Sequence, residues 1–308
     1  MTGARLRIGT RGSPLALAQT ETVRALLAAH VPALGAPDAF ETMIIRTTGD
    51  KVLDRPLAEI GGKGLFSKEI DEAMLDGRID LAVHSVKDLP TFLPDGIVLA
   101  AVLPREDPRD VLIASVGRIA LLPTGALIGT SSPRRQAQLL ARRPDLRIAP
   151  LRGNVHTRLR KVADGTVAAT LLARAGLNRL GLGGTGTPID ESELLPAVGQ
   201  GAIGVTCRDD DPMVVDWLAA IGDDHARIEV TAERAMLAAL DGSCRTPIGG
   251  LGRCGSSGGF DLRGLVVRPD GSELMRGERR GVARDAVAMG DDLGQELRGR
   301  AGPGFFTA

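Results

Sequence analysis

Two adjacent arginines, Arg134 and Arg135, lie where the sequence predicts the first turn of a helix. Residues 126–130 resemble a buried strand that ends in a turn, and Ser132 followed by Pro133 is typical of a helix start. Backbone N–H groups are unpaired there and the helix dipole is positive, so each guanidinium is unfavourable by a few tenths to about 1 kcal/mol. A bound carboxylate or phosphate would reverse that sign through forked hydrogen bonds. The alternative is a pair of solvated arginines on a surface helix.

The same pattern occurs near the start of the chain. Residues 6–10 read as a strand, Ser13 and Pro14 open an apolar helix, and Arg11 lies in the connecting turn. This internal similarity indicates two related α/β units, each directing a strand-to-helix turn at a shared cleft. Neither turn has the glycine spacing of a nucleotide-binding loop, so nucleotide binding is not supported.

Length and composition restrict the classes of protein that fit. A chain of 308 residues with 43% hydrophobic residues suggests two or three domains. The 38 basic residues balance 38 acidic ones, which argues against a general nucleic-acid binder, and the 2% aromatic content leaves few stacking platforms for single strands. Three cysteines without a C-x-x-C pair fit a reducing compartment, and no long apolar run could span a membrane. We therefore expect a soluble, cytoplasmic protein.

Strands and helices alternate in the N-terminal third, which predicts a largely parallel sheet. The predicted elements are strands over 43–45, 81–83, 168–172 and 202–206, and helices over 68–75 and 230–240. A charged stretch over 48–59 is interpreted as a mobile surface loop, and the proline-bounded segment 104–110 as a hinge between domains. The glycine-rich tail after Leu297 is expected to fray.

Two further places could carry chemistry. Asp88 lies beside Lys87, just after a predicted strand. Its carboxylate could transfer a proton or stabilise a cation there. The alternative is that Asp88 only caps the turn. Cys244 lies in a glycine- and proline-rich loop beside Arg245, with no histidine nearby, so covalent attachment of a group fits better than nucleophilic catalysis. Lys63 could bind an anion or simply be solvated. The four histidines are scattered, so no metal site is expected.

Nine segments in order resemble the porphobilinogen deaminase family, also called hydroxymethylbilane synthases. These segments cover residues 7–19, 61–66, 83–90, 105–110, 129–139, 151–161, 175–181, 196–204 and 232–249. The resemblance implies a transferase of haem biosynthesis that joins four porphobilinogen molecules head to tail, with loss of ammonia, into a linear tetrapyrrole. It also implies a dipyrromethane primer bound covalently through Cys244, and no metal or nucleotide.

Each pyrrole ring carries an acetate and a propionate, so the resemblance also implies a site for polyanions. The catalytic residues that it implies are Asp88, which would protonate the departing amine and stabilise positive charge on pyrrole nitrogens, and Lys87, which would hold a substrate carboxylate. The cofactor-binding residues it implies, besides Cys244, are Arg11, Ser85, Thr130, Ser131, Ser132, Arg134, Arg135, Arg152 and Gln200. The substrate-binding residues it implies are Arg11, Lys63, Phe66, Arg152, Arg158 and Arg179. Glu59 departs from the family, where a basic residue is frequent.

The family fold implies three domains: two α/β domains similar to periplasmic binding proteins, on either side of a cleft, and a smaller C-terminal α+β domain. Domain 1 would comprise 1–104 and 201–221, domain 2 would comprise 105–200, and domain 3 would comprise 222–308 with the cysteine loop. A monomer is expected. One alternative is a non-enzymatic binder of small anions with the same architecture, which would need neither the cysteine loop nor the Lys87–Asp88 pair. An arginine-rich RNA-binding protein is the other, and zero net charge argues against it.

Overall fold

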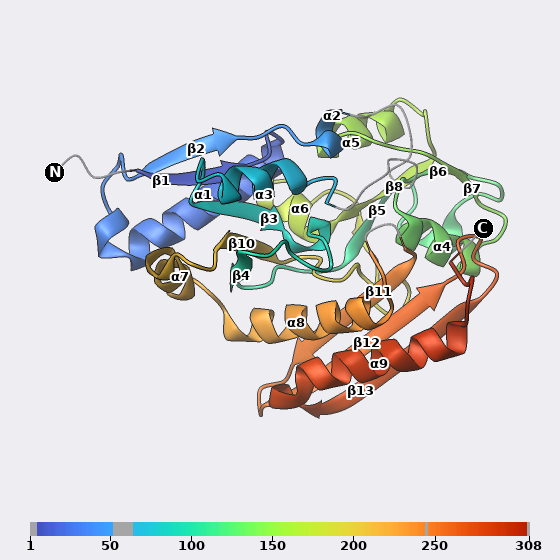
Figure 1. Ribbon diagram of the computed structural model, residues 1–308. Helices are drawn as coiled ribbons and strands as arrows, with labels where there is room; N and C mark the ends of the chain where they lie inside the picture. Colours follow the sequence, from blue (N-terminus) through green and yellow to red (C-terminus); the bar gives the residue numbers. More distant parts are fainter. Residues whose placement is uncertain (1–4, 52–63, 244–245, 307–308) are drawn as a thin grey trace. The chain divides into compact units, whose positions relative to one another are not determined.

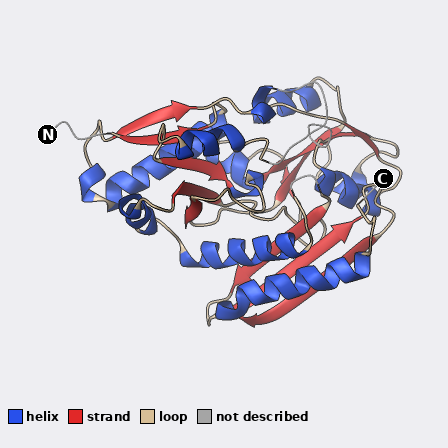
Figure 2. Cartoon of the chain, viewed as in Figure 1, coloured by secondary structure: helices blue, strands red, loops and turns tan. Residues whose placement is uncertain are grey.

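The computed structural model describes residues 5–51, 64–243 and 246–306, which form three sheets (Figures 1 and 2). The chain divides into two compact units. The first combines the N-terminal part up to Arg105 with Ala202–Arg227, and the second combines Glu106–Gly201 with the chain from Ile228 onward. The predicted second and third domains thus belong to one compact unit, although each has a sheet of its own.

The first unit contains a five-stranded sheet in the order β2-β1-β3-β10-β4. Its strands are β1 (Leu6–Thr10), β2 (Phe40–Ile44), β3 (Leu81–Ser85), β4 (Ile97–Val102) and β10 (Ile203–Arg208). β1 runs parallel to β2 and β3, with Ile8 opposite Leu81, whereas β10 is antiparallel to β3 and β4. The strand after Gln200 therefore completes the first sheet, as the resemblance implied.

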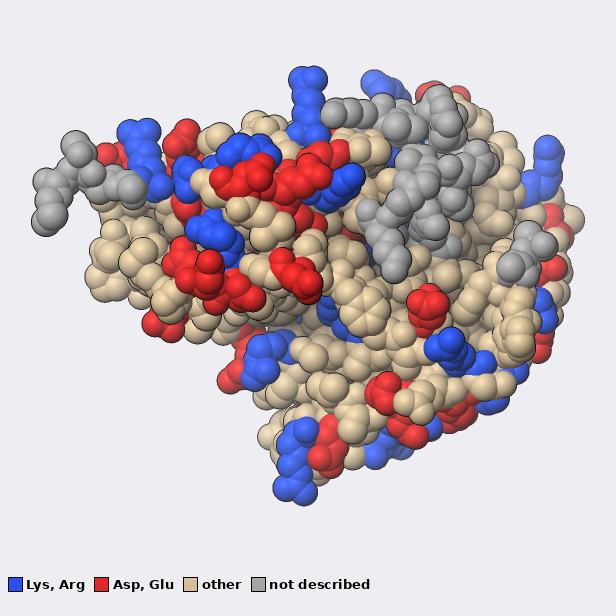
Figure 3. Space-filling view, in the orientation of Figure 1, with Lys and Arg blue, Asp and Glu red and all other residues tan. Residues whose placement is uncertain are grey.

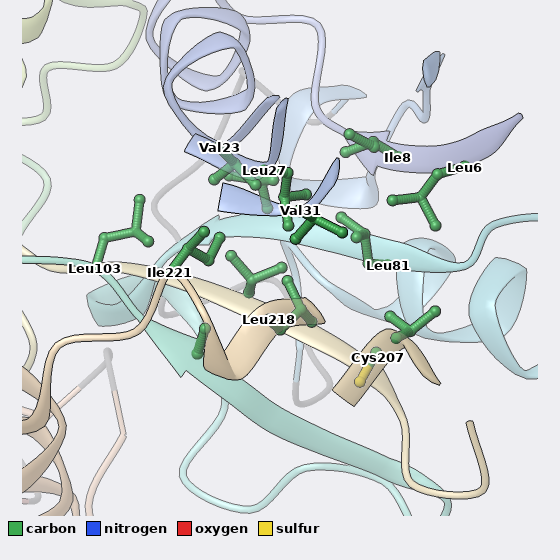
Figure 4. Close-up of a cluster of buried hydrophobic side chains, with 14 of the residues drawn as sticks. Leu6, Ile8, Val23, Leu27, Val31, Leu81, Leu103, Cys207, Leu218 and Ile221 are labelled. Carbon is green, nitrogen blue, oxygen red and sulfur yellow. The ribbon is translucent and has the colours of Figure 1, made fainter. Parts of the chain in front are cut away.

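Alternating side chains let helices cover both faces of this sheet. Leu81 and Val83 pack with α1 (Pro14–His30) and α7 (Pro212–Ala219) in the core drawn in Figure 4. Ala82 points the other way, into a cluster with Ile70 and Met74 of α3. Helix α3 spans Lys68–Leu75, as predicted. The predicted cap of α1 is also confirmed, because the Ser13 hydroxyl accepts a hydrogen bond from Ala16 N–H at 3.2 Å.

The second unit repeats this strand order in the sheet β7-β6-β8-β5-β9. Its strands are β5 (Asp110–Ala114), β6 (Leu127–Gly129), β7 (Arg147–Ala149), β8 (Ala169–Ala173) and β9 (Thr187–Pro188). β6 is parallel to β7 and β8, and β5 is antiparallel to β8 and β9. β6 thus corresponds to β1, and β5 corresponds to β10. The internal similarity detected in the sequence is the signature of this repeated architecture.

Helices also cover both faces of the second sheet. Leu112 and Leu171 pack against Leu139 of α4 (Pro133–Arg142). Val111, Ile113 and Leu172 face the opposite layer, formed by α5 (Val155–Ala163) and α6 (Arg174–Arg179). Ser132 caps α4 as predicted, and its hydroxyl accepts a hydrogen bond from Arg135 N–H at 3.4 Å.

The third sheet is antiparallel and consists of β11 (Ile248–Cys254), β12 (Gly259–Val267) and β13 (Leu274–Val282). One face packs on α8 (Asp224–Ala239) and α9 (Ala286–Ala301). Shorter elements of the chain are α2 (Thr48–Lys51) and 3₁₀ turns at Pro32–Leu34, Val86–Asp88, Ile119–Leu121 and Ala283–Asp285. The predicted fold class, two α/β sheets and a smaller C-terminal α+β layer, is confirmed.

Three predictions about elements need correction. The first sheet is mixed rather than largely parallel, because β10 returns antiparallel in its interior. Helix α8 begins six residues before the predicted 230, since the Asp223 carboxylate accepts a hydrogen bond from Ala226 N–H at 2.7 Å and caps it early. The tail does not fray after Leu297, because α9 continues and the ring of Phe305 is buried beneath Arg268.

Charges of both signs are interspersed on the face of the molecule seen in Figure 3. This matches the zero net charge, so a site for anions has to come from a local group of residues. In the described part of the chain, every helix is too short or too polar to cross a membrane.

The pKa of Asp71 in α3 generates a testable prediction. Burial raises this pKa from 3.8 to about 6, although Ser67 opposes the shift. Between these values the folded protein keeps a proton that the unfolded chain has lost, so the free energy of unfolding falls as pH rises. The stability advantage of Asp71→Asn should therefore grow by about 2 kcal/mol from pH 4 to pH 6.

Urea unfolding of the variant and the unchanged protein at several pH values measures this difference. Asp76→Asn, at the exposed C-terminal end of the same helix, is the matched control and should show a much smaller pH dependence. A difference between Asp71→Asn and the unchanged protein that does not vary between pH 4 and pH 6 would contradict the prediction.

Candidate functional site

The first group of predicted site residues lies at the carboxyl edge of the parallel strands in the first sheet. Arg11 follows β1 directly and Ser85 is the last residue of β3. Lys87 and Asp88 belong to the 3₁₀ turn that comes next. Because β1 and β3 are parallel neighbours, the turns after them share the edge where α/β folds place their ligands.

Arg11 is held by an aspartate that the sequence analysis missed. The Asp50 carboxylate accepts a hydrogen bond from Arg11 Nε at 3.1 Å and pairs with Nη2, while the guanidinium lies 4.3 Å from the centre of the Phe66 ring. Burial acts to lower the pKa of Arg11, but the hydrogen bonds from Arg11 to Asp50 and the charges of Asp88 and Asp50 raise it overall. Arg11 therefore remains a cation, and Asp88 is close enough for its charge to act on it.

Ser85 is oriented by a second buried side chain. Gln19 Nε2 donates to the Ser85 hydroxyl at 2.9 Å, and Gln19 itself is almost completely buried in α1. The preceding residue, His84, is buried with Nε2 3.0 Å from the Thr206 hydroxyl, and burial lowers its pKa to about 4. This neutral, enclosed imidazole packs inside the sheet and is not available for acid or base chemistry at the site.

The second group lies at the equivalent edge of the second sheet. The turn after β6 is stabilised by its own side chains, because the Thr130 hydroxyl accepts a hydrogen bond from Ser132 N–H at 3.2 Å. The Ser131 hydroxyl accepts a hydrogen bond from Leu151 N–H at 3.1 Å and so joins this turn to the one after β7. Arg152 follows in that second turn. The hydrogen bond thus brings the segment that carries Arg152, a residue expected from the resemblance, next to the hydroxyl-rich turn.

Arg134 and Arg135 occupy the first turn of α4, as predicted, but they already have an anionic partner within the chain. Both side chains are buried and paired with the buried Asp110, Arg134 Nη2 at 2.7 Å and Arg135 Nη2 at 2.6 Å from its oxygens. The two guanidinium groups do have an anionic partner at the helix start, but this partner is a carboxylate of the chain itself. Contact between these arginines and a ligand carboxylate stays a prediction.

Asp110 is ionised despite its burial. Burial alone would raise its pKa, but the charges of Arg134 and Arg135 lower it to about 2. From its sequence context, Asp110 was expected only as the end of the hinge segment 104–110. The signal that could have identified it is a single carboxylate directly before an apolar strand, at the edge where the arginines lie.

The chain near Gly201 brings two more predicted residues together. Gln200 is buried, and its Nε2 donates to Pro108 O at 2.7 Å and to Asp110 Oδ1 at 3.1 Å. Arg179 ends α6 and donates to Gly201 O at 2.6 Å, while burial lowers its pKa in spite of the nearby charge of Glu106. Gln200 therefore joins Asp110, Arg134 and Arg135 in one buried group, the Asp110 cluster.

Arg158 lies on α5, where its Nε donates to Gly153 O at 2.9 Å.

Some of the predicted residues lie outside the described part of the chain. These are Lys63, Cys244, Arg245, Glu59 and the rest of residues 52–59 of the predicted loop. Thr48–Lys51, the beginning of that loop, form helix α2. In the described ranges, no group of His, Cys, Asp and Glu residues is arranged to hold a metal ion.

Comparison with known proteins identifies the family. The model of the porphobilinogen deaminase, dipyromethane cofactor binding domain matches residues 6–216, and that of the porphobilinogen deaminase C-terminal domain matches 227–299. The chain belongs to the porphobilinogen deaminase family. It is therefore an enzyme of tetrapyrrole biosynthesis that polymerises porphobilinogen, and the predicted family and activity are confirmed.

Individual relatives extend over nearly the whole chain. The porphobilinogen deaminase of Paracoccus denitrificans (strain Pd 1222) is 56% identical over 304 residues, covering 98% of this chain and 96% of the relative. The chloroplastic porphobilinogen deaminase of Oryza sativa subsp. japonica is 50% identical over 307 residues, covering 98% of this chain and 86% of the relative. Among solved structures, the alkanesulfonate-binding protein SsuA from Xanthomonas axonopodis pv. citri is 16% identical over 78% of this chain and 76% of that protein. Its TM-score of 0.38 is too low to carry an argument.

Replacing Gly201, which adjoins the predicted porphobilinogen deaminase site residue Gln200, should lower the stability of the protein strongly. Its φ is +94°, and an added Cβ would lie 2.3 Å from Glu106 O. Gly181 has a similar φ of +71° but open space around it. Gly181→Ala should cost about 1 to 2 kcal/mol for the left-handed backbone alone. Gly201→Ala should cost at least about 1 kcal/mol more, because it also forces backbone apart.

Urea unfolding of the two variants gives the comparison directly. Equal losses of stability in Gly181→Ala and Gly201→Ala would show that the close approach of Gly201 to Glu106 can relax without cost. That result would contradict the prediction.

Proposed function

We propose that this enzyme joins four porphobilinogen molecules head to tail, releasing ammonia at each step, on a dipyrromethane primer attached to Cys244. The family model for a dipyromethane cofactor binding domain supports the primer. The observation that carries the proposed chemistry is the placement of Asp88 beside Arg11 at the carboxyl edge of the first sheet. Attachment through Cys244 rests on the resemblance. So does the expectation of a cytoplasmic monomer that needs no metal.

The donors of the described residues fit a polyanion. Two linked pyrrole rings carry four carboxylates, and the second sheet gathers arginines and hydroxyl groups at one edge. Arg134 Nε is buried there without a hydrogen-bond partner among the described residues. A buried donor of this kind is costly unless a ligand or water satisfies it. A carboxylate is the acceptor that suits a guanidinium best.

We infer two overlapping sets of binding residues. Those that would hold the dipyrromethane carboxylates are Arg11, Ser85, Thr130, Ser131, Ser132, Arg134, Arg135, Arg152 and Gln200. Those that would hold the substrate carboxylates are Arg11, Lys63, Phe66, Arg152, Arg158 and Arg179. When bound, the dipyrromethane supplies the pyrrole carbon to which the first substrate is joined.

Asp88 is the proposed acid and electrostatic catalyst. Its carboxyl group would give a proton to the departing amine of porphobilinogen, and the resulting carboxylate would stabilise the positive charge that develops on the pyrrole nitrogen. Lys87, on the same 3₁₀ turn, would hold a substrate carboxylate and so orient the ring. Arg11 would do the same from the turn after β1. A prepositioned carboxylate lowers the barrier because the protein need not reorganise around the new charge.

Replacing Asp88 tests this function. Asp88→Asn should fold normally and keep its primer, yet lose roughly 10² to 10⁴-fold in turnover, because the amide can neither give a proton nor carry the charge. Asp95→Asn, at an exposed position of the same unit, is the matched control and should keep full activity.

Release of ammonia from porphobilinogen measures turnover, and the mass of the intact protein reports the primer. Activity of Asp88→Asn within a few fold of the control would remove Asp88 from the chemistry.

A further inference from the structure

The Asp110 cluster is an almost completely buried group of three charged side chains in the described part of the second unit. The exposed fraction is 0% for the Asp110 side chain, 5% for Arg134 and 7% for Arg135. One carboxylate thus faces two guanidinium groups, which leaves a net positive charge in a buried place. Burying a charge is costly unless it is paired and hydrogen-bonded.

The two carboxylate oxygens divide their contacts. Asp110 Oδ2 pairs with Arg134 Nη2 at 2.7 Å. Asp110 Oδ1 accepts hydrogen bonds from Arg135 Nε at 3.1 Å, Arg135 Nη2 at 2.6 Å and Gln200 Nε2 at 3.1 Å. A single side chain therefore fixes both arginines and the buried glutamine.

Each guanidinium has a second anchor on the backbone. Arg135 Nη1 donates to Leu171 O at 2.8 Å, and Arg134 Nη1 donates to Leu195 O at 2.7 Å. Arg134 contacts Asp110 through one nitrogen and Arg135 contacts it through two, and each also reaches one carbonyl, so each planar group is held in one orientation. Of the two, only Arg134 keeps a buried guanidinium nitrogen, Nε, without a partner among the described residues.

We propose that Asp110 is a positioning residue: its carboxylate holds Arg134 and Arg135 at the start of α4 before any ligand is bound. Without this internal anion, two like charges would lie together at the positive end of a helix dipole. With it, the pair can be buried in the protein that has not yet received its primer. The link to the primer rests on the proposed function, but the role of Asp110 in the unloaded protein does not.

The first test replaces the missing carboxylate by formate. Protein produced in cells that cannot make porphobilinogen carries no primer, and in this form Asp110→Ala should melt well below the unchanged protein. Sodium formate should raise the melting temperature of Asp110→Ala by several degrees relative to sodium chloride at equal ionic strength. It should leave the unchanged protein unaffected, and also Asp110→Asn, whose amide fills the space.

Asp145→Ala is the matched control for the formate effect. Asp145 pairs with Arg143 in the same unit, but its side chain is 31% exposed. Water can replace this carboxylate, so formate should not stabilise the variant. Failure of formate to stabilise Asp110→Ala would overturn the proposal, and so would equal stabilisation of Asp145→Ala.

The second test separates positioning from stability. Asp110→Asn and Leu139→Ala, a buried change in the same helix α4, are incubated with porphobilinogen at a temperature where both are folded. Intact mass then gives the rate of primer uptake per folded molecule. Positioning predicts at least tenfold slower uptake in Asp110→Asn, whereas equal rates would mean that Asp110 acts on stability alone and would overturn the proposal. If the unchanged protein takes up no primer, the proposed function fails, and the formate result alone decides the role of Asp110.

Discussion

The interaction on which this structure depends is the compensation of buried positive charge at the carboxyl edge of a sheet. An enzyme that handles polyanions needs guanidinium groups that are oriented and partly dehydrated, since forked hydrogen bonds are strong only under those conditions. The same burial destabilises the folded protein before the ligand is bound, because the charged groups lose their hydration. Asp110 meets this requirement for Arg134 and Arg135, and Asp50 meets it for Arg11. In both cases a carboxylate of the chain pairs with a guanidinium that a carboxylate of the cofactor or the substrate is proposed to contact.

The repeated sheet explains why the arginines occur where they do. In each five-stranded sheet the second strand in spatial order is followed by a short turn and a serine-capped helix, so the residues of that turn always reach the carboxyl edge. The antiparallel strand of each sheet begins at this same edge, and in the second sheet it brings Asp110 there. Gln200, from a distant part of the chain, joins the cluster by a hydrogen bond to Asp110. The architecture thus collects charged residues that are far apart in sequence.

Local features were predictable because short-range rules decide them. The serine caps, the proline at the first helical position, the helix Lys68–Leu75 and the internal similarity all follow from neighbouring residues. The partners of the arginines were not predictable in this way. Asp110 lies 24 residues before Arg134 and Asp50 lies 39 after Arg11, so only the fold brings them together. The early start of α8 was missed because its cap, Asp223, lies well before the predicted start at residue 230.

The most direct test of the account is the mass of the intact protein under denaturing conditions, because a carboxylate-binding enzyme of this family is proposed to carry its primer covalently. The unchanged protein should be heavier than its sequence by two linked pyrrole units. That excess should map to the peptide containing Cys244 and be absent from Cys244→Ser. A protein that keeps the mass of its sequence after incubation with porphobilinogen would contradict the account and favour a non-covalent binder of small anions.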